Sequence, residues 1–303
     1  MAFAAIDVGT NSVKMLIGSL AEDRVVPELH RVQITRLGQG LAASGSISTE
    51  AADRTIEVLA GLRKLAEERK VQQVAAVGTQ ALRAAKNSDD FLSRCEREAG
   101  LPLRILTDEE EARLSFQGAS WAVQSPRVTA VDIGGGSTEV MAGTRSSLER
   151  WWSLPMGAVV MTEQFLKSDP PAEEEMRLMS ASIEKHLRAV DLQPGPQTEL
   201  VGVGGTVAAL MMHTARKAKT DPRTLSSARI PFDEVSSMAI HLSLRTTADR
   251  EEMGFERGRA DIIVAGAWIL AAVMSRLGAP AMRASVHGLR HGLLIEMASG
   301  RWR

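Results

Sequence analysis

The hydrophobic and polar positions of the chain fall into segments of strand-like and helix-like period. Near the N-terminus, three segments rich in apolar and β-branched residues, FAAID, VKMLIGSL and HRVQITRLG, are separated by turn-prone or charged positions. They predict a meander of three strands. Apolar residues then recur at helical spacing after Ser48, the expected N-cap, as far as Lys70. A short strand over 74–79, a helix ending at Gly100 and a strand over 103–107 are predicted to follow.

The second half of the chain repeats this order after the linker-like segment QSPR (124–127). RVTAVDIG, STEVMAG and LERWWSL predict a second meander, and ELVGVG and MRASV predict two further strands. Helices are predicted over 157–167, 173–190, from Thr206 onwards, over 259–278 and over 287–298. Because strands and helices alternate, we predict an α/β fold with helices on the faces of its sheets. The two copies predict two similar domains, 1–124 and 125–303, facing one another across a shared cleft.

One motif occurs twice. AIDVGTNSVKML (5–16) and AVDIGGGSTEVM (130–141) both read apolar–Asp–apolar–Gly–any–any–Ser, and their aspartates, Asp7 and Asp132, lie 132 − 7 = 125 residues apart. A strand that ends in Asp before a glycine turn places a carboxylate at its carboxyl end, where open α/β sheets bind ligands. The simpler alternative is a tight hairpin turn without a ligand, which the presence of two copies at matching places disfavours.

Phosphate is the ligand that fits this motif. Glycines let backbone N–H groups approach phosphate oxygens, and Ser12, Ser137 and Thr138 add hydroxyl donors. Two such loops would hold successive phosphates of one ligand, with Mg²⁺ (or Mn²⁺) at the two aspartates. A third glycine loop, GVGGT (202–206), joins a predicted strand to a predicted helix. Residue 207 is a valine, so this loop lacks the G-x-G-x-x-G pattern of dinucleotide-binding proteins, and phosphate at a helix N-terminus is the better interpretation.

Two further residues have the type and position for chemistry on a phosphate. Thr107 and Glu110 have the spacing of a capping box, which places Glu111 in the first turn of a helix. An ionised Glu111 would orient or deprotonate a water; the alternative is that the acidic first turn only stabilises the helix. Arg83, in GTQALR after a predicted buried strand, would neutralise charge on a transferring phosphoryl group, or would simply lie on the surface of a helix.

Composition and charge narrow the class of protein. A net charge of −1, with 44% hydrophobic and 24% charged residues, is typical of a globular protein and gives no basic field to recruit nucleic acid. Cys95 is the only cysteine, so we expect neither a disulfide within the chain nor a cysteine zinc site. The longest apolar run, 262–274, is too short to span a bilayer, so we expect a buried helix, no membrane partner and a cytoplasmic location. His287 and His291 are spaced like some zinc ligands, but no third ligand accompanies them in the sequence.

The chain resembles the exopolyphosphatase/guanosine pentaphosphate phosphohydrolase (Ppx/GppA) family in its short form, without the C-terminal helical extension of longer members. The resemblance covers essentially the whole chain and rests on the ordered motifs IDVGTNSVKML, GTQALR, EEEARLSF, VDIGGGSTE, LPMGAVVMTEQF, VGVGGT, RADIIVAGAWIL and HGLRHGLL. It implies two ribonuclease-H-like domains of the actin and sugar-kinase superfamily around an interdomain cleft. It also implies a homodimer, although the apolar run 262–274 would serve a protein core equally well.

The resemblance also implies roles for individual residues. Glu111 matches the catalytic glutamate, Arg83 the arginine after GT, and Asp132 and Glu139 the metal- and water-associated acids; Asp7 is expected to join these two at the metal. The motifs and the resemblance together predict the phosphate-binding residues Gly9, Thr10, Asn11, Ser12, Gly134, Gly135, Gly136, Ser137, Thr138, Gly204, Gly205 and Thr206. This chain departs from the family pattern at Val160, where members usually carry arginine, and at His291, where they carry glutamate.

We therefore predict an exopolyphosphatase-type phosphohydrolase that releases terminal orthophosphate from polyphosphate, in particular short chains, and/or from pppGpp. Water would attack the terminal phosphorus in line, assisted by Glu111, with Mg²⁺ or Mn²⁺ as the cofactor. Two alternatives stay open at this point: an ATP-dependent sugar or acid kinase of the same superfamily, and a nonhydrolytic sensor of polyphosphate or alarmone. A phosphate-release assay separates the three.

Overall fold

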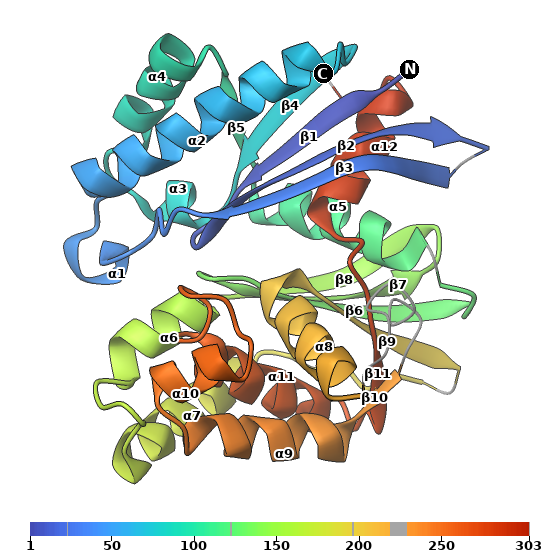
Figure 1. The fold of residues 1–303 in the computed structure, drawn as a ribbon. Helices are drawn as coiled ribbons and strands as arrows, with labels where there is room; N and C mark the ends of the chain where they lie inside the picture. The colour runs from blue at the N-terminus through green and yellow to red at the C-terminus, as the bar shows by residue number, and fades with distance from the viewer. Residues whose placement is uncertain (23, 122, 196, 219–228, 303) are drawn as a thin grey trace. The chain divides into compact units, whose positions relative to one another are not determined.

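The computed structural model describes residues 1–22, 24–121, 123–195, 197–218 and 229–302 (Figure 1). Contacts within the chain divide it into two compact units. The first unit comprises Met1–Gly118 and His287–Arg303, and the second comprises Ala119–Val286. Each unit is built around its own mixed β-sheet, as the α/β prediction requires.

The first unit begins with the predicted meander. Its strands are β1 (Phe3–Val8), β2 (Ser12–Ala21), β3 (Arg24–Ile34), β4 (Gln73–Gly78) and β5 (Leu103–Ile105), and its helices are α1 (Leu41–Ser44), α2 (Thr49–Glu68), α3 (Gln80–Ala84), α4 (Ser88–Ala99), α5 (Asp108–Trp121) and α12 (Leu289–Ala298). The strand order is β3-β2-β1-β4-β5; β1, β2 and β3 are antiparallel neighbours, whereas β4 runs parallel to β1 and β5 to β4. The carboxyl ends of β1, β4 and β5 therefore lie at one edge of the sheet.

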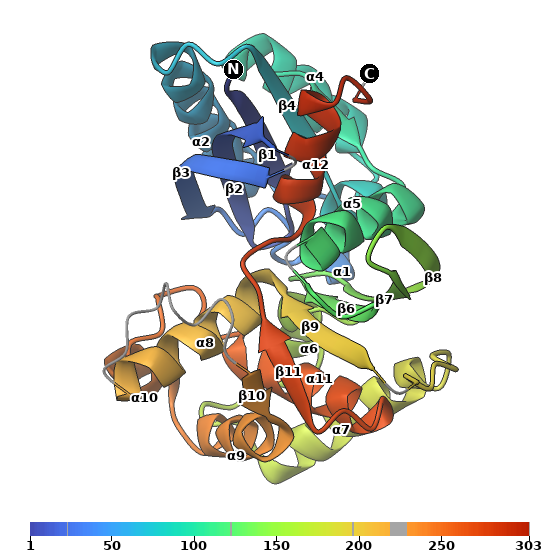
Figure 2. The ribbon, with the colours of Figure 1, turned by 90° about the vertical axis from the view of Figure 1, so that its right-hand side faces the viewer.

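Helices cover both faces of this sheet. Helix α2 lies on one face, with α4 packed against it, and α12 lies on the other face across β1 and β2 (Figures 1 and 2). Helix α12 also packs on α5 through a glycine: a Cβ at Gly292 would lie 2.0 Å from the carbonyl oxygen of Leu114. Since this approach leaves no room for a side chain, Gly292 fixes how closely the two helices pack.

The second unit repeats the arrangement of the first. Its strands are β6 (Arg127–Ile133), β7 (Thr138–Thr144), β8 (Ser147–Leu154), β9 (Thr198–Val203), β10 (Arg229–Pro231) and β11 (Ala281–Ala284), and its helices are α6 (Ala158–Phe165), α7 (Glu173–Leu187), α8 (Gly204–Ala218), α9 (Phe232–Ser243), α10 (Thr247–Glu252) and α11 (Ile263–Arg276). Its strand order is β10-β11-β9-β6-β7-β8, with β6, β7 and β8 antiparallel and β9 parallel to both β6 and β11. The meander followed by parallel strands occurs in both units, which confirms the predicted repeat.

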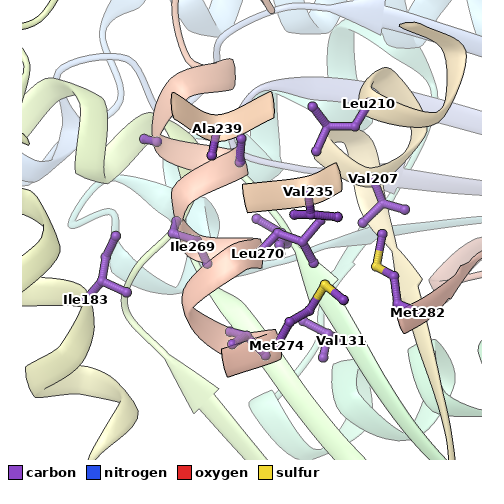
Figure 3. Packing of buried hydrophobic residues seen from close by; sticks show 14 of the residues in the cluster. Val131, Ile183, Val207, Leu210, Val235, Ala239, Ile269, Leu270, Met274 and Met282 are labelled. Carbon is purple, nitrogen blue, oxygen red and sulfur yellow. The ribbon is translucent and has the colours of Figure 1, made fainter. Parts of the chain in front are cut away.

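Helix α11 forms the centre of the second unit's core. It contains most of the longest apolar run, and it packs against α6, α7, α8 and α9. The close-up in Figure 3 shows how this core is filled, with contributions from the sheet and from several helices: Val131, Ile183, Val207, Leu210, Val235, Ala239, Ile269, Leu270, Met274 and Met282. The apolar run thus serves the core of its own unit. Among the described residues, no helix is long and apolar enough to cross a membrane.

The unit boundaries differ from the predicted domains 1–124 and 125–303. The second unit starts at Ala119, within the last turns of α5, and the segment from His287 onwards returns to the first unit. The physical reason is the location of α12, whose apolar side chains Leu293 and Leu294 are fully buried where the helix packs on β1 and β2. Sequence order alone gives no sign of this return, because α12 follows β11 of the second unit directly.

Candidate functional site

The repeated motif forms the same hairpin turn in both units. In the first unit the amide of Gly9 donates to the carbonyl of Ser12 at 3.1 Å, and in the second the amide of Gly134 donates to the carbonyl of Ser137 at 3.0 Å. Both turns connect the first two strands of a meander. The predicted phosphate-binding residues Gly9, Thr10, Asn11 and Ser12 therefore form one loop, and Gly134, Gly135, Gly136, Ser137 and Thr138 form its counterpart.

The two hairpins differ in the residue opposite the aspartate. Asp7 pairs across β1 and β2 with Lys14, whose Nζ lies 3.1 Å from Asp7 Oδ2. At the matching place in the second unit, Asp132 pairs across β6 and β7 with Glu139. Opposite charges stabilise directly opposed positions and like charges destabilise them. Two opposed carboxylates fit a hard divalent cation, whereas the ammonium group of Lys14 already supplies a cation beside Asp7.

Glu139 is held in place by the neighbouring strand. Its side chain is buried, with 2% of its surface exposed, and Ser153 Oγ of β8 donates to Glu139 Oε1 at 3.1 Å. Thr138 Oγ1 donates to the carbonyl of Met156 at 2.6 Å. Among the described residues, no group of three or more His, Cys, Asp or Glu side chains has the arrangement of a metal site. A magnesium ion at Asp132 and Glu139 would take its further ligands from phosphate and water, which is how Mg²⁺ commonly binds.

The loop of the second unit is braced by the start of α6. Gly134 O accepts from the amide of Ala158 at 2.9 Å, and Gly135 O accepts from the amides of Val159 and Val160 at 2.9 and 3.2 Å. A Cβ at Gly157 would lie 2.3 Å from the carbonyl group of Gly135, so only glycine fits there. Val160, which replaces the arginine usual in the family pattern, thus contributes its backbone amide to the loop.

Arg83 and Glu111, predicted separately, are brought together in the first unit. Arg83 Nη1 lies 2.7 Å from Glu111 Oε2 and donates to the carbonyl of Leu106 at 2.9 Å, while Nη2 lies 2.6 Å from Asp108 Oδ1. Arg83 extends from α3, after β4, and Glu111 from α5, after β5. Since both side chains are largely buried, the alternative that Arg83 is only a surface residue is wrong.

The helix that carries Glu111 starts where the capping box predicts. Glu110 N donates to Thr107 Oγ1 at 3.2 Å, and Thr107 N donates to Glu110 Oε2 at 3.0 Å. Glu111 N donates to the carbonyl of Thr107 at 2.9 Å. The first turn of α5 thus carries Glu111 at the positive end of the helix, which favours a negative charge there.

The third glycine loop lies beside Asp132. Gly204 begins α8 with a left-handed φ of +93°, and a Cβ on it would lie 2.5 Å from Asp132 Oδ1. A Cβ on Gly205 would lie 2.5 Å from Nη1 of Arg259. Gly204 is required by its left-handed φ and by the close approach of Asp132 and of the Ile133 backbone, whereas the atoms nearest Gly205 belong to the end of the flexible Arg259 side chain. Thr206 packs against Gly266 of α11, where a Cβ would come within 2.5 Å of Thr206 Oγ1.

Two cations at these loops, Lys14 and Arg259, were not among the predicted site residues. Lys14 stands opposite Asp7 at the register position of Glu139, so alignment of the two repeats reveals it. Arg259 precedes α11 in the RAD segment, and its burial lowers the pKa of its guanidinium, opposed by Glu256 and Asp261. Its contact with the Gly204–Gly205 turn comes from tertiary packing that no local pattern reveals.

His287 and His291 lie in the first unit, in front of and on α12. Their rings are edge-on with centroids 4.4 Å apart, and His30 of β3 lies 5.9 Å from His291. Neither ring nitrogen of His291 has a hydrogen-bond partner among the described residues, and the side chain is 1% exposed. Burial lowers the pKa of His291 well below its ordinary value, with further contributions from His287, Arg290 and His30. A buried neutral imidazole is the state that this environment favours.

Comparisons with known proteins agree with the geometry. The model of the family described as "Ppx/GppA phosphatase family" matches residues 23–300. Exopolyphosphatase 2 of Mycobacterium tuberculosis is 31% identical over 315 residues, which cover 97% of this chain and 98% of that protein. Exopolyphosphatase 1 of Mycobacterium bovis is 30% identical, covering 98% of this chain and 88% of the relative.

Solved structures of similar proteins share the fold over the whole chain. An Aquifex aeolicus member of the Ppx/GppA family superposes with a TM-score of 0.83 at 31% identity, covering 100% of this chain and 99% of the other. An exopolyphosphatase from Cytophaga hutchinsonii superposes with a TM-score of 0.91 at 25% identity, covering 99% of this chain and 98% of the other. These matches confirm the predicted fold class and the predicted family.

Proposed function

Because the chain belongs to the Ppx/GppA phosphatase family, we propose that it is an exopolyphosphatase-type phosphohydrolase that removes terminal orthophosphate from inorganic polyphosphate. The 5′-triphosphate of pppGpp ends in a chemically similar phosphoanhydride, so we propose this alarmone as a second substrate. The observation that carries the proposal is the ion pair of Glu111 and Arg83 at the edge of the sheet that also holds the Gly9–Ser12 turn. The exopolyphosphatases among its relatives support the same substrate class.

Glu111 is proposed as the general base. A water oxygen attacks the terminal phosphorus, Glu111 accepts the water proton, and the bond from phosphorus to the bridging oxygen breaks. The bridging oxygen leaves with the shortened chain, and the products are orthophosphate and a polyphosphate with one phosphate fewer. Arg83 holds Glu111 at 2.7 Å and is itself anchored on the carbonyl of Leu106. We therefore assign Arg83 as the residue that positions Glu111.

Phosphate oxygens are proposed to bind at the glycine loops. The two hairpin turns, the N-terminus of α8 at Gly204 and the cations Lys14 and Arg259 would supply donors and positive charge. We place Mg²⁺ or Mn²⁺ at Asp132 and Glu139. Asp7 is not assigned to the metal, because its carboxylate forms an ion pair with Lys14. When bound, the metal would neutralise negative charge on phosphate oxygens.

A phosphate-release assay with purified protein tests this proposal. Short polyphosphate, pppGpp and ATP are compared with and without Mg²⁺. We expect orthophosphate from polyphosphate and pppGpp without any acceptor molecule. ADP formation from ATP only in the presence of a sugar or acid, with the phosphoryl group transferred to that acceptor and no orthophosphate released, would identify a kinase. Tight binding of polyphosphate without any release would identify a nonhydrolytic sensor.

A further inference from the structure

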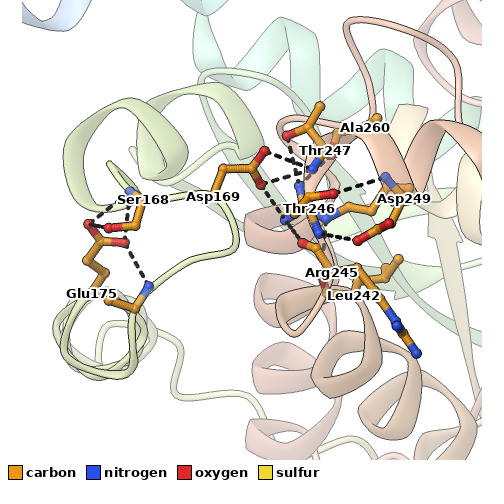
Figure 4. Close-up of polar contacts among 11 residues, drawn as sticks. Ser168, Asp169, Glu175, Leu242, Arg245, Thr246, Thr247, Asp249 and Ala260 are labelled. Carbon is orange, nitrogen blue, oxygen red and sulfur yellow. Dashed lines mark hydrogen bonds and ion pairs between the residues drawn. The ribbon is translucent and has the colours of Figure 1, made fainter.

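Arg250 of α10 is a buried cation bound almost entirely to backbone carbonyls. Its side chain is 2% exposed. Nε donates to Leu242 O at 3.1 Å, Nη1 to Ala260 O at 2.8 Å and Nη2 to Arg245 O at 2.6 Å. Leu242, Arg245 and Ala260 accordingly gather around the start of α10 (Figure 4). One guanidinium thus joins the end of α9, the turn before α10 and the segment that leads into α11.

The surroundings of Arg250 fix its position. Thr246 caps α10 through a reciprocal pair of hydrogen bonds with Asp249, at 3.1 and 2.9 Å (Figure 4). Asp169 accepts from the amide of Thr247 at 2.9 Å, and its Oδ1 lies 3.5 Å from Nη2 of Arg250. Burial lowers the pKa of Arg250, and the charges of Asp169, Asp261 and Asp249 oppose this effect. Since Arg250 is held by both α10 and Asp169, the groups that it binds are fixed with it.

Ala260 links the hydrogen bonds of Arg250 to the Gly204–Thr206 loop, because the residue before Ala260 is Arg259. The turn that carries Arg259 is short: Arg259 N donates to Glu256 O at 2.8 Å, and Ile262 N donates to Arg259 O at 3.1 Å. The guanidinium of Arg259 reaches the Gly204–Gly205 turn from this segment. Within the turn, the carbonyl of Ala260 is the group that Arg250 binds.

We propose that Arg250 is a positioning residue, which holds the backbone at Ala260 so that the guanidinium of Arg259 stays at the Gly204–Thr206 phosphate loop. This inference rests on the proposed function in one respect, the binding of substrate phosphate at that loop. A buried charge is expensive, and apolar replacements of buried ionic groups often leave stability unchanged or higher. A contribution to folding stability therefore does not explain a cation at this place. Its ability to hold three carbonyls in a defined geometry does.

The test uses Arg250→Lys, which keeps the charge but loses the planar fork that reaches three carbonyls at once. The matched control is Arg276→Lys in the same unit, because Arg276 also binds a backbone carbonyl, that of Val190, at the opposite end of α11. For tripolyphosphate hydrolysis, we expect Arg250→Lys to raise KM about tenfold with a smaller change in kcat. Arg276→Lys should leave both constants unchanged.

A double-mutant cycle with Arg259→Met separates positioning from a general loss of stability. In the Arg259→Met background, Arg250→Lys should raise KM less than about twofold, because the guanidinium that it positions is gone. An unchanged KM for Arg250→Lys with a lowered Tm, or effects of the two substitutions that multiply, would overturn the proposal. If Arg250→Lys does not fold, Asp169→Asn takes its place in the cycle. Asp169 is about half exposed, so we expect this variant to fold, and an unchanged KM would again overturn the proposal.

Calorimetric titration with tripolyphosphate distinguishes this inference from the proposed function. If the wild-type protein binds tripolyphosphate without releasing phosphate, the hydrolytic function is wrong. The inference about Arg250 is then supported if Arg250→Lys weakens tripolyphosphate binding in the protein that contains Arg259 but not in the Arg259→Met variant. Any other result overturns it. If the wild-type protein neither binds nor hydrolyses tripolyphosphate, both proposals are wrong.

Discussion

Glu111→Gln keeps the shape of the side chain but removes the charge that lies 2.7 Å from Arg83. As the proposed general base is lost, we expect kcat for polyphosphate to fall by about 10²–10⁴-fold, with little change in substrate binding. The matched control is Glu109→Gln, an exposed residue in the same helical turn. Steady-state phosphate release measures both variants. Near wild-type turnover by Glu111→Gln would reduce Glu111 to a residue that stabilises the start of α5.

The two aspartates of the repeated motif should respond differently to metal. Because Asp132 stands opposite Glu139 whereas Asp7 contacts Lys14, Asp132→Asn should raise the Mg²⁺ concentration for half-maximal activity by about tenfold. Asp7→Asn should leave that concentration unchanged, whatever it does to turnover. Activity of the wild-type protein should vanish in EDTA. Hydrolysis that persists in chelated buffer, or equal metal requirements of the two variants, would contradict the assignment of the metal to the second unit.

At the scale of helices and strands, local chemistry predicts element ends well. Ser48 caps α2 by accepting from Ala51 N at 3.2 Å, and Gly100 ends α4 with a left-handed φ of 62°, as expected. Helix α9 was missed although Phe232, Val235 and Leu242 follow a helical period. Strand β10 spans only Arg229–Pro231 and is too short for a pattern.

The same distinction between local signals and long-range contacts applies to the residues of the site. Loop residues could be predicted because a strand followed by glycines fixes a turn within a few positions, as at Gly134. The pairing of Arg83 with Glu111 joins helices that follow different strands, and the contact of Arg259 with Gly205 spans 259 − 205 = 54 positions. Such contacts depend on sheet register and helix packing, which cannot be predicted from the local pattern of a single sequence.

Helix α6 should tolerate no side chain at its N-cap. A Cβ in Gly157→Ala would lie 2.3 Å from backbone atoms of Gly135, so the Gly134–Thr138 loop or the helix must move. We expect a loss of about 1–3 kcal/mol in unfolding free energy and a raised KM for polyphosphate. The control is Gly61→Ala on the exposed side of α2, where a Cβ meets nothing within 4 Å and should stabilise the helix slightly. A Gly157→Ala protein with wild-type stability and KM would contradict the close approach.

His287 and His291, before and on α12, should make the stability of the protein pH-dependent. Burial lowers the pKa of His287 and His291 in the folded protein, so below about pH 6.5 the unfolded chain binds more protons than the folded one. Stability is therefore full above that pH and falls as the pH decreases, by at most about 1.4 kcal/mol per pH unit for each histidine. His291→Gln should flatten the decrease of Tm between pH 7.5 and 5.5, whereas His241→Gln, on the exposed side of α9, should not. Parallel Tm profiles for His291→Gln and wild-type protein would contradict this role.

At the scale of the whole molecule, charge governs how a polyanion is retained between cleavages. Long polyphosphate carries about one negative charge per phosphate, and the sequence has a net charge of −1, so no general field attracts the chain. We expect local groups to retain the substrate, namely the proposed phosphate-binding loops with Lys14 and Arg259 among the described residues, and each of these contacts only a few phosphates. Electrostatic affinity grows with the number of phosphates that are neutralised. If only a few phosphates are contacted, the shortened polyphosphate should dissociate after each cleavage.

We accordingly expect distributive hydrolysis and a preference for short polyphosphates. Release between cuts shortens all chains of a long substrate together, because each chain returns to the pool after losing one phosphate. A gel of partly digested long polyphosphate should then show a population that shifts gradually to shorter lengths. Salt should raise KM only weakly, since few counterions are displaced per binding event. Full-length chains beside fully degraded material, with nothing between them, would show processive digestion and therefore an extended cationic surface that binds many more phosphates than these loops reach.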